Sequence, residues 1–272
     1  MTDSIIIQRQ DGTKYDLDQC DFKVISFDPP FFNYNHSFTN ISDDIPTLTQ
    51  TTMQQMTIPL VIELHANDYY DYELQVLKLR QIFTSNEYFY IINSRIPFLR
   101  YKVVAQAFDI KRLSNFYYTQ SITINLIAID GCAETLGVTS DSTFTKDLSS
   151  WGLGENIPTK TISYTFNSNV FTFYNLGLLT LKADSRPVLM KINATADNLQ
   201  IINKTTNQTW QLNHHIDSNN ELDLNGVKPV YQGQNLYSST NHGYLDFVSG
   251  ANDIEISNAS NLTITFETRF YF

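Results

Sequence analysis

The sequence MTIPLVIELHANDYYDYELQVLKLRQIF, residues 56–83, contains the clearest change of periodicity in the chain. Its first nine residues place apolar side chains at every second position, which predicts a strand with one buried face. Asn67 and Asp68 can then cap free backbone amides, and the negative charge of Asp71 suits the N-terminal end of a helix. We therefore predict a strand that leads directly into a helix.

The predicted helix carries two apolar stripes with spacings of three and four residues, which is typical of a helix that packs on other elements. The stripes are Tyr70, Leu74 and Leu77 on one side, and Val76, Leu79 and Phe83 on the other. We expect both stripes to be buried, so that the helix has few exposed positions and covers a sheet. Strands are predicted after it at 88–92, 101–107 and 122–128, where apolar residues alternate or tyrosines gather.

The composition favours a mainly β protein with two domains. A chain of 272 residues is longer than one typical domain. It has 16 Tyr and 18 Phe but only 17% charged residues, a balance that suits strands better than long solvated helices. The net charge of -10, with basic residues scattered singly, argues against nucleic acid as a partner.

Neither export nor membrane insertion is indicated. The opening residues 1–10 lack the basic start and apolar core of a signal peptide. No run approaches the roughly 18 apolar residues that a membrane-spanning helix requires. Cys20 and Cys132 are the only cysteines and belong to no CxxC pair, so we expect reduced, buried thiols.

The first domain is predicted to span residues 1–138. Asp11 and Gly12 form a turn signal between two short apolar runs, which predicts an opening hairpin. The segment Phe31 to Gln55 is rich in Asn, Thr and Ser with isolated aromatics, so we expect a long loop or an extended arm. Such a segment could reach a neighbouring subunit.

Residues 139–160 are predicted to be a linker, because Ser, Thr, Asp, Gly and Pro dominate there. The second domain, 161–272, shows short strands separated by turn residues, a pattern that indicates a β-sandwich. Separate strands are expected at 188–194 and 199–203, with Asp197 and Asn198 between them. The closing strand should bury one face, formed by Leu262, Ile264, Phe266, Phe270 and Phe272.

No catalytic or metal-binding constellation stands out, and we expect no cofactor. His214 and His215 are adjacent, so on a strand they would point to opposite faces; His36, His65 and His242 are isolated. Two carboxylate pairs could in principle serve a glycoside hydrolase, but the solvated face of a strand is the preferred explanation for both. These pairs are Glu221 with Asp223, and Asp253 with Glu255.

Trp210 and Tyr231 allow two interpretations. On an exposed sheet face they could stack on a sugar ring, because an amphipathic aromatic side chain can cover an apolar sugar surface. They could equally fill the core of the sandwich. A carbohydrate-binding protein is therefore the alternative function to be weighed.

The order of four features resembles the distal tail protein (Dit) family of long-tailed phages with non-contractile tails. These features are the hairpin at Asp11-Gly12 with Tyr15 and Leu17, the helix Tyr72 to Phe83 followed by Tyr88 to Ile92, the stretch Phe98 to Val103, and Gly250 to Ile256 followed by Leu262 to Phe272. None is a catalytic signature. Their order and spacing together cover most of the chain.

The resemblance implies a non-enzymatic virion protein of the tail tip, made in the bacterial cytoplasm. Its N-terminal domain would form a homo-hexameric ring, and its C-terminal domain would be a galectin-like β-sandwich. The ring would join the tail tube protein to a baseplate, tail-fibre or receptor-binding protein. Some members of the family carry an inserted carbohydrate-binding module, but this chain has no room for one, which argues against host-sugar binding. The alternative function, a carbohydrate-binding β-sandwich protein with a host cell-wall saccharide as its partner, follows from the sugar binding of many galectin-like sandwiches.

Overall fold

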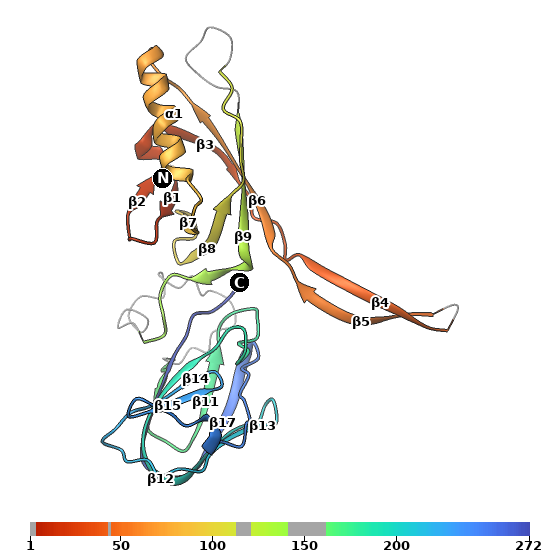
Figure 1. The fold of residues 1–272 in the computed structure, drawn as a ribbon, viewed down its shortest axis with the longest axis vertical. Coiled ribbons are helices and arrows are strands. Elements are labelled where there is room, and N and C mark those ends of the chain that lie inside the picture. Colours follow the sequence, from red (N-terminus) through yellow and green to blue (C-terminus); the bar gives the residue numbers. More distant parts are fainter. Residues whose placement is uncertain (1–3, 43–44, 113–120, 141–161) are drawn as a thin grey trace. The chain divides into compact units, whose positions relative to one another are not determined.

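The computed structural model describes residues 4–42, 45–112, 121–140 and 162–272, and the chain divides into two compact units, Met1–Glu134 and Thr135–Phe272. Both units are built mainly of β-strands (Figure 1), so the predicted fold class is confirmed. The galectin-like character of the second unit stays a prediction. No helix among the described residues has the length and apolarity needed to cross a membrane.

The first unit contains a seven-stranded sheet with the order β2-β1-β7-β8-β9-β6-β3. Strand β1 pairs antiparallel with both β2 and β7, as the predicted opening hairpin requires. A short 3-10 helix, η1 (Asp18–Cys20), connects β2 to β3. The strands are β1 (Ile5–Gln8), β2 (Lys14–Asp16), β3 (Phe22–Phe27), β6 (Met56–Leu64), β7 (Phe89–Asn93), β8 (Leu99–Ala105) and β9 (Ile122–Thr135).

The strand-to-helix transition occurs where the sequence predicts it. Strand β6 buries every second side chain from Met56 to Leu64 in the core of this unit. Helix α1 (Tyr69–Phe83) follows, and the carboxylate of its N-cap residue Asp68 accepts a hydrogen bond of 2.9 Å from the amide of Asp71. Capping of a free amide therefore explains why the helix begins there.

One of the two predicted helix stripes is wrong. Val76, Leu79 and Phe83 are buried in the core of the first unit, as expected. Tyr70, Leu74 and Leu77 instead lie on the outer side of α1, with 78%, 65% and 57% of their surfaces exposed. A sheet can cover only one side of a helix, and among the described residues no second layer covers the other (Figure 1).

The segment 31–55 forms a two-stranded antiparallel hairpin, which we call the arm. Its strands are β4 (Tyr34–Ser42) and β5 (Ile45–Met53), and they pair only with each other. The sequence predicts a long loop or an extended arm here. The structure supports the second alternative, with regular strands that the polar composition does not reveal.

The second unit contains an eight-stranded sheet with the order β10-β17-β12-β14-β15-β16; β11 also pairs with β17, and β13 with β12. The 3-10 helix η3 (Tyr237–Ser239) follows β16. The strands are β10 (Thr165–Phe166), β11 (Val170–Asn175), β12 (Leu189–Asn203), β13 (Gln208–Leu212), β14 (Leu222–Asn225), β15 (Lys228–Tyr231), β16 (Gln234–Asn235) and β17 (Gly250–Glu267).

Two strand predictions for this unit need correction. The strands expected at 188–194 and 199–203 form one strand, β12, and the expected break is a register shift between Ala196 and Gln200 in its pairing with β17. The closing strand ends at Glu267 instead of Phe272. The reason for the end is a change of partner, because the backbone amide of Thr268 bonds the hydroxyl of Thr139 at 3.0 Å.

Residues 135–139 are part of the second unit. The amide of Thr135 donates to the carbonyl of Phe270 at 2.9 Å, and the buried Thr139 hydroxyl donates to the carbonyl of Phe266 at 2.6 Å. The predicted linker 139–160 lies outside the described residues except for its first two positions. Its first residue is thus held by hydrogen bonds within the fold.

Candidate assembly surface

The arm is the most exposed part of the first unit. All described side chains of β5 are exposed or half-buried, and Tyr34 and Phe38 of β4 are exposed by 41% and 63%. Among the described strands, β4 and β5 pair with each other and with no third strand, so each has one edge that no other described strand covers. Such edges can pair with a strand of another chain.

An aromatic row runs along one face of β4 and the residues before it. Alternate side chains of a strand share a face, which places Phe32, Tyr34, His36 and Phe38 in succession. Consecutive ring centroids lie 6.2, 6.3 and 6.4 Å apart. His36 also contacts β5, since its Nδ1 lies 3.0 Å from the Thr51 hydroxyl. The row is a preformed apolar contact surface.

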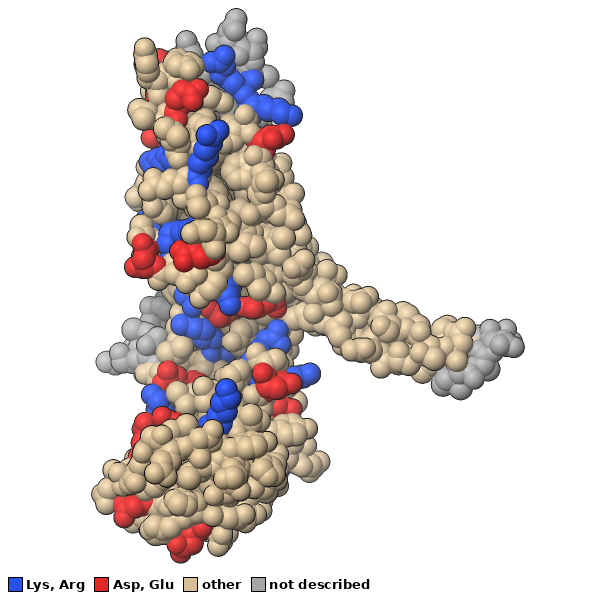
Figure 2. Space-filling model, in the orientation of Figure 1, with Lys and Arg blue, Asp and Glu red and all other residues tan. Residues whose placement is uncertain are grey.

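The charged residues of the arm are confined to one position in its sequence. Between Asp28 and Glu63 the sequence contains no Lys or Arg, and its only acidic residues are Asp43 and Asp44, between β4 and β5; Figure 2 shows the described part of the arm without blue or red atoms. Soluble proteins usually protect exposed strand edges with charges, especially lysine. A hairpin whose two strands carry exposed aromatic residues and no charged residue is therefore suited to association with another protein surface.

The base of the arm is fixed against β9 by a glycine. Gly131 has φ of +66°, and a Cβ built there would lie 2.3 Å from the carbonyl oxygen of Gln54. The Gln54 amide donates to the carbonyl of Asn33 at 2.8 Å and so closes the hairpin. Only glycine permits both this backbone conformation and this close approach.

Charged and aromatic side chains interleave on β7, β8 and β9. The guanidinium of Arg100 lies 3.7 Å from the ring centroid of Tyr90 and 2.6 Å from a carboxylate oxygen of Glu134. Both partners of this ion pair are largely buried, with 11% and 14% of their side chains exposed. Lys102 lies in the same way over the ring of Tyr88, at 4.5 Å. This network stabilises the sheet.

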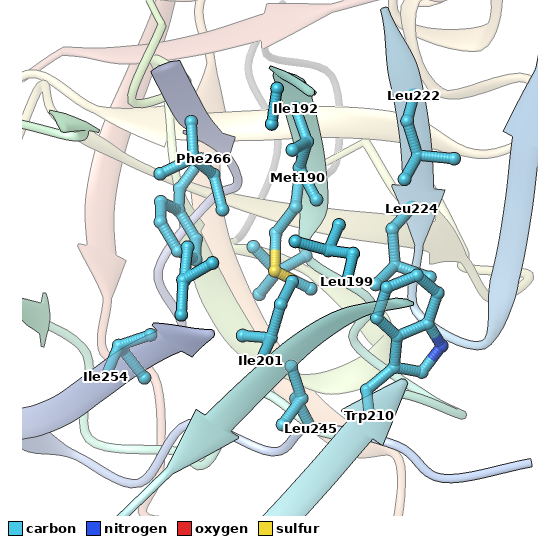
Figure 3. Close-up of a cluster of buried hydrophobic side chains, with 14 of the residues drawn as sticks. Met190, Ile192, Leu199, Ile201, Trp210, Leu222, Leu224, Leu245, Ile254 and Phe266 are labelled. Atoms are coloured by element: carbon cyan, nitrogen blue, oxygen red, sulfur yellow. The ribbon is translucent and has the colours of Figure 1, made fainter. Parts of the chain in front are cut away.

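The two aromatic residues considered for sugar binding lie in the core of the second unit. Trp210 is 1% exposed and packs among Met190, Leu199 and neighbouring aliphatic side chains (Figure 3). Tyr231 is 7% exposed, and its hydroxyl accepts a hydrogen bond of 3.0 Å from the amide of Asp217. The second interpretation, core packing, therefore describes both residues.

The five histidines are not brought together. His214 contacts the ring of Tyr231, His215 pairs with Asp197 at 2.7 Å, and His242 lies 4.8 Å from the ring of Tyr237. His65 lies 3.4 Å from Glu63, and this contact together with Lys23 lowers the pKa of the Glu63 carboxyl. Across the described residues, no group of three or more His, Cys, Asp or Glu side chains could hold a metal ion.

The predicted carboxylate pairs take part in cross-strand contacts. Asp253 accepts a hydrogen bond of 2.9 Å from the hydroxyl of Thr172, and Glu255 pairs with Lys204 at 2.5 Å. Asp223 lies opposite Lys191 in the β12–β14 register, while Glu221 is exposed. The hydrogen bond that Lys191 donates to Glu267, together with the nearby carboxylates, raises the pKa of Lys191. These contacts are typical of charged and polar side chains on the faces of a sheet.

Both cysteines are buried thiols, with Cys20 in η1 and Cys132 in β9, where the Cys132 thiol donates to the carbonyl of Asp130 at 3.4 Å.

Comparison with known proteins identifies a protein family that resembles the first unit. Residues 10–128 match the model of the family described as phage tail protein RIFT-related domain. The family resemblance to distal tail proteins is confirmed by this match together with a solved structure that covers nearly the whole chain.

That structure is the Dit protein (gp 19.1) of phage SPP1, described as a paradigm of hub adsorption apparatus in phages that infect Gram-positive bacteria. The similarity covers 98% of this chain and 99% of the SPP1 chain, with a TM-score of 0.69 and 11% sequence identity. A chain of the activated phage P2 baseplate with calcium is also similar, with a TM-score of 0.44, 13% identity and 98% coverage of both chains. No curated protein matches the sequence.

Proposed function

We propose that this protein is the distal tail hub of a siphophage virion, a structural protein that forms a hexameric ring. The ring would join the tail tube protein on one side to the baseplate, tail-fibre or receptor-binding protein on the other. The observation that carries the proposal is the match of residues 10–128 to the phage tail family in a chain that has the SPP1 Dit fold over 98% of its length.

The arm supports the ring. A homo-oligomer with closed symmetry repeats one contact around its axis, so a projecting element of each subunit can lie on the next subunit. The arm has the chemistry for such a contact, because no other described strand pairs with its edges, its aromatic row is exposed and its two strands contain no charged residue. Burial of these two strands against a neighbour would therefore desolvate no ionised side chain of theirs.

The proposed role needs no chemistry from the protein. A hub holds its neighbouring proteins in fixed positions, and it does so through the interfaces between subunits. The family and the fold are those of a structural tail protein, and we propose that the chain is not an enzyme. Trp210 and Tyr231, the two aromatic residues considered for sugar stacking, are buried in the core, so neither supports the carbohydrate-binding alternative.

The test is the absolute mass of the purified full-length protein by light scattering across a concentration series. A mass near six times 31.3 kDa, about 188 kDa, is expected for the ring. A variant in which residues 34–53 are replaced by Asn-Gly closes the chain with a two-residue turn at the Asn33–Gln54 hydrogen bond. We expect this variant to remain folded, because β4 and β5 belong to no other sheet, but to lose the ring.

A monomer at every concentration would overturn the closed ring as a property of the isolated protein. A ring that persists without residues 34–53 would remove the arm from the interface. Where light scattering finds a species of six subunits, negative-stain images would show whether that species is a closed ring.

A further inference from the structure

The arm needs a receiving surface on the next subunit, and that surface must differ from the arm itself. A ring with six-fold rotational symmetry is closed by heterologous contacts, each of which joins two different surfaces of neighbouring copies. An arm that paired with another arm would instead give a two-fold contact and a dimer. The receiving surface of the ring therefore lies elsewhere on the chain.

The arm offers an apolar face that spans both of its strands. Residues directly opposite each other on paired strands share a face. In the β4–β5 register Phe38 lies opposite Leu48, so Leu48 extends the aromatic row onto the second strand. Tyr34 lies opposite Met53 in the same way. A two-stranded hairpin is only marginally stable alone, and packing against a helix is one of the arrangements that stabilise it.

Helix α1 has an apolar side that nothing in the described part of its own subunit covers. It is the only α-helix among the described residues, and its inner side packs in the core of the first unit. Its outer side carries Tyr70, Leu74 and Leu77, which we call the stripe. Spacings of four and three residues make these side chains neighbours along the helix. A hairpin laid on the stripe would supply the second layer that the helix lacks.

The other exposed apolar residues of the first unit form no comparable surface. Outside the arm and α1, the large ones among the described residues are single side chains on separate elements, namely Ile25, Ile96 and Ile129. Within one subunit the arm extends away from the sheet that α1 covers (Figure 1). The helix on which the arm can pack is therefore that of a neighbouring copy.

The charges around the stripe suit a partner with uncharged strands. Glu73 and Lys78 are exposed and border the stripe on its two sides, since Glu73 follows Tyr70 by three residues and Lys78 follows Leu74 by four. Their charges are opposite, so the surface has no net charge. Strands β4 and β5 contain no charged residue. The contact would then have an apolar centre with charged groups only at its rim, as protein interfaces commonly do.

We propose that the stripe of α1 receives the arm of the neighbouring copy of this chain, with the aromatic row of the arm facing Tyr70, Leu74 and Leu77. The inference rests on the proposed ring and names the contact that closes it. Each subunit would place its arm on one neighbour and receive the arm of the other.

The first test is light scattering of the full-length variant Leu74→Gln with Leu77→Gln. Both positions are exposed and glutamine is a good helix former, so the unfolding temperature should not change. The concentration at which half of the protein is assembled should rise at least about tenfold. The control, Val170→Gln with Leu178→Gln, changes two side chains of the second unit that are 65% and 64% exposed. It should keep the mass of the unsubstituted ring.

Cross-linking tests the contact directly. Asn40→Cys lies two residues beyond Phe38 on β4 and Lys78→Cys borders the stripe, so neither substitution removes an apolar contact. The full-length chain with both substitutions is treated with a short bismaleimide and separated on a denaturing gel. We expect a ladder of up to six chains, while Asn40→Cys alone should give single chains. The unsubstituted protein controls for Cys20 and Cys132, which are buried.

The results separate this contact from the hub function. A Leu74→Gln, Leu77→Gln protein that assembles like the unsubstituted ring would overturn the inference and leave the ring in place. So would an assembled double-cysteine variant without cross-linked products. Cross-linked dimers of Asn40→Cys alone would show that the arm contacts a second arm instead. A monomer of the unsubstituted protein at every concentration would remove the ring and, with it, the proposed contact.

Discussion

Replacing Gly131 by alanine should disturb the base of the arm more than the rest of the first unit. An L-amino acid in the left-handed region costs about 1–2 kcal/mol, and this applies at φ of +66°. The added Cβ would also lie 2.3 Å from the carbonyl oxygen of Gln54, which is backbone and cannot rotate away. We expect a total loss of about 2–4 kcal/mol in the free energy of unfolding.

The matched control is Gly12→Ala, because Gly12 has φ of +88° but no atom within 4 Å of an added Cβ. It reports the conformational cost without the clash. Urea unfolding measures stability, and light scattering at matched concentrations measures the ring. We expect Gly131→Ala to be the less stable variant and to shift the ring toward smaller species, because Gln54 closes the hairpin on Asn33. Equal stability and equal mass for the two variants would refute the assigned role of Gly131.

Three further predictions concern the two cores. Phe266→Ala should lower the unfolding free energy by about 3–5 kcal/mol in urea titrations, because Phe266 is fully buried among other phenylalanine rings; a loss below about 1 kcal/mol would contradict this. Glu134→Gln should cost about 2–4 kcal/mol by leaving Arg100 largely buried without its charge partner, whereas Lys111→Gln in an exposed pair should cost under about 0.5 kcal/mol. Burial raises the pKa of the Tyr164 phenol, so the phenol stays protonated in the folded state while the unfolded state ionises above about pH 10. The stability difference between the native protein and Tyr164→Phe should therefore be constant below that pH and fall by about 1.4 kcal/mol per unit above it; a difference independent of pH would refute the shift.

The best predicted parts of the fold are those in which local and tertiary preferences agree. Strand β6 alternates in sequence and in burial, and the cap at Asp68 places the start of α1 correctly. The outer stripe of α1 was predicted to be buried because Leu74 and Leu77 are apolar. Whether a second layer covers a helix depends on contacts between elements, and a periodicity cannot report such contacts.

The arm and the long strand β12 show a different limit. The arm lacks the alternation of a half-buried strand, since neither of its faces belongs to the core. In β12, Asp197 and Asn198 are turn-forming residues, yet they fall in a register shift within one continuous strand because β17 continues beside them. Trp210 shows the same limit for a candidate binding residue. Sequence alone could not decide between a sugar-stacking position and a core position for this side chain, and the structure places it in the core.

The composition of the arm is explained if another protein surface covers the arm in the assembled particle. An isolated two-stranded hairpin is only marginally stable in water, and open edges favour uncontrolled pairing. A protein that kept this hairpin in solvent would benefit from charges along its strands, but β4 and β5 contain none, and the only charged residues between 29 and 62 are Asp43 and Asp44, which lie between the two strands in the sequence. A neighbouring surface would satisfy the open edges, bury the row from Phe32 to Phe38 and remove the hazard. The same features that would be a liability for a monomer therefore suit a subunit whose arm is covered by its neighbour.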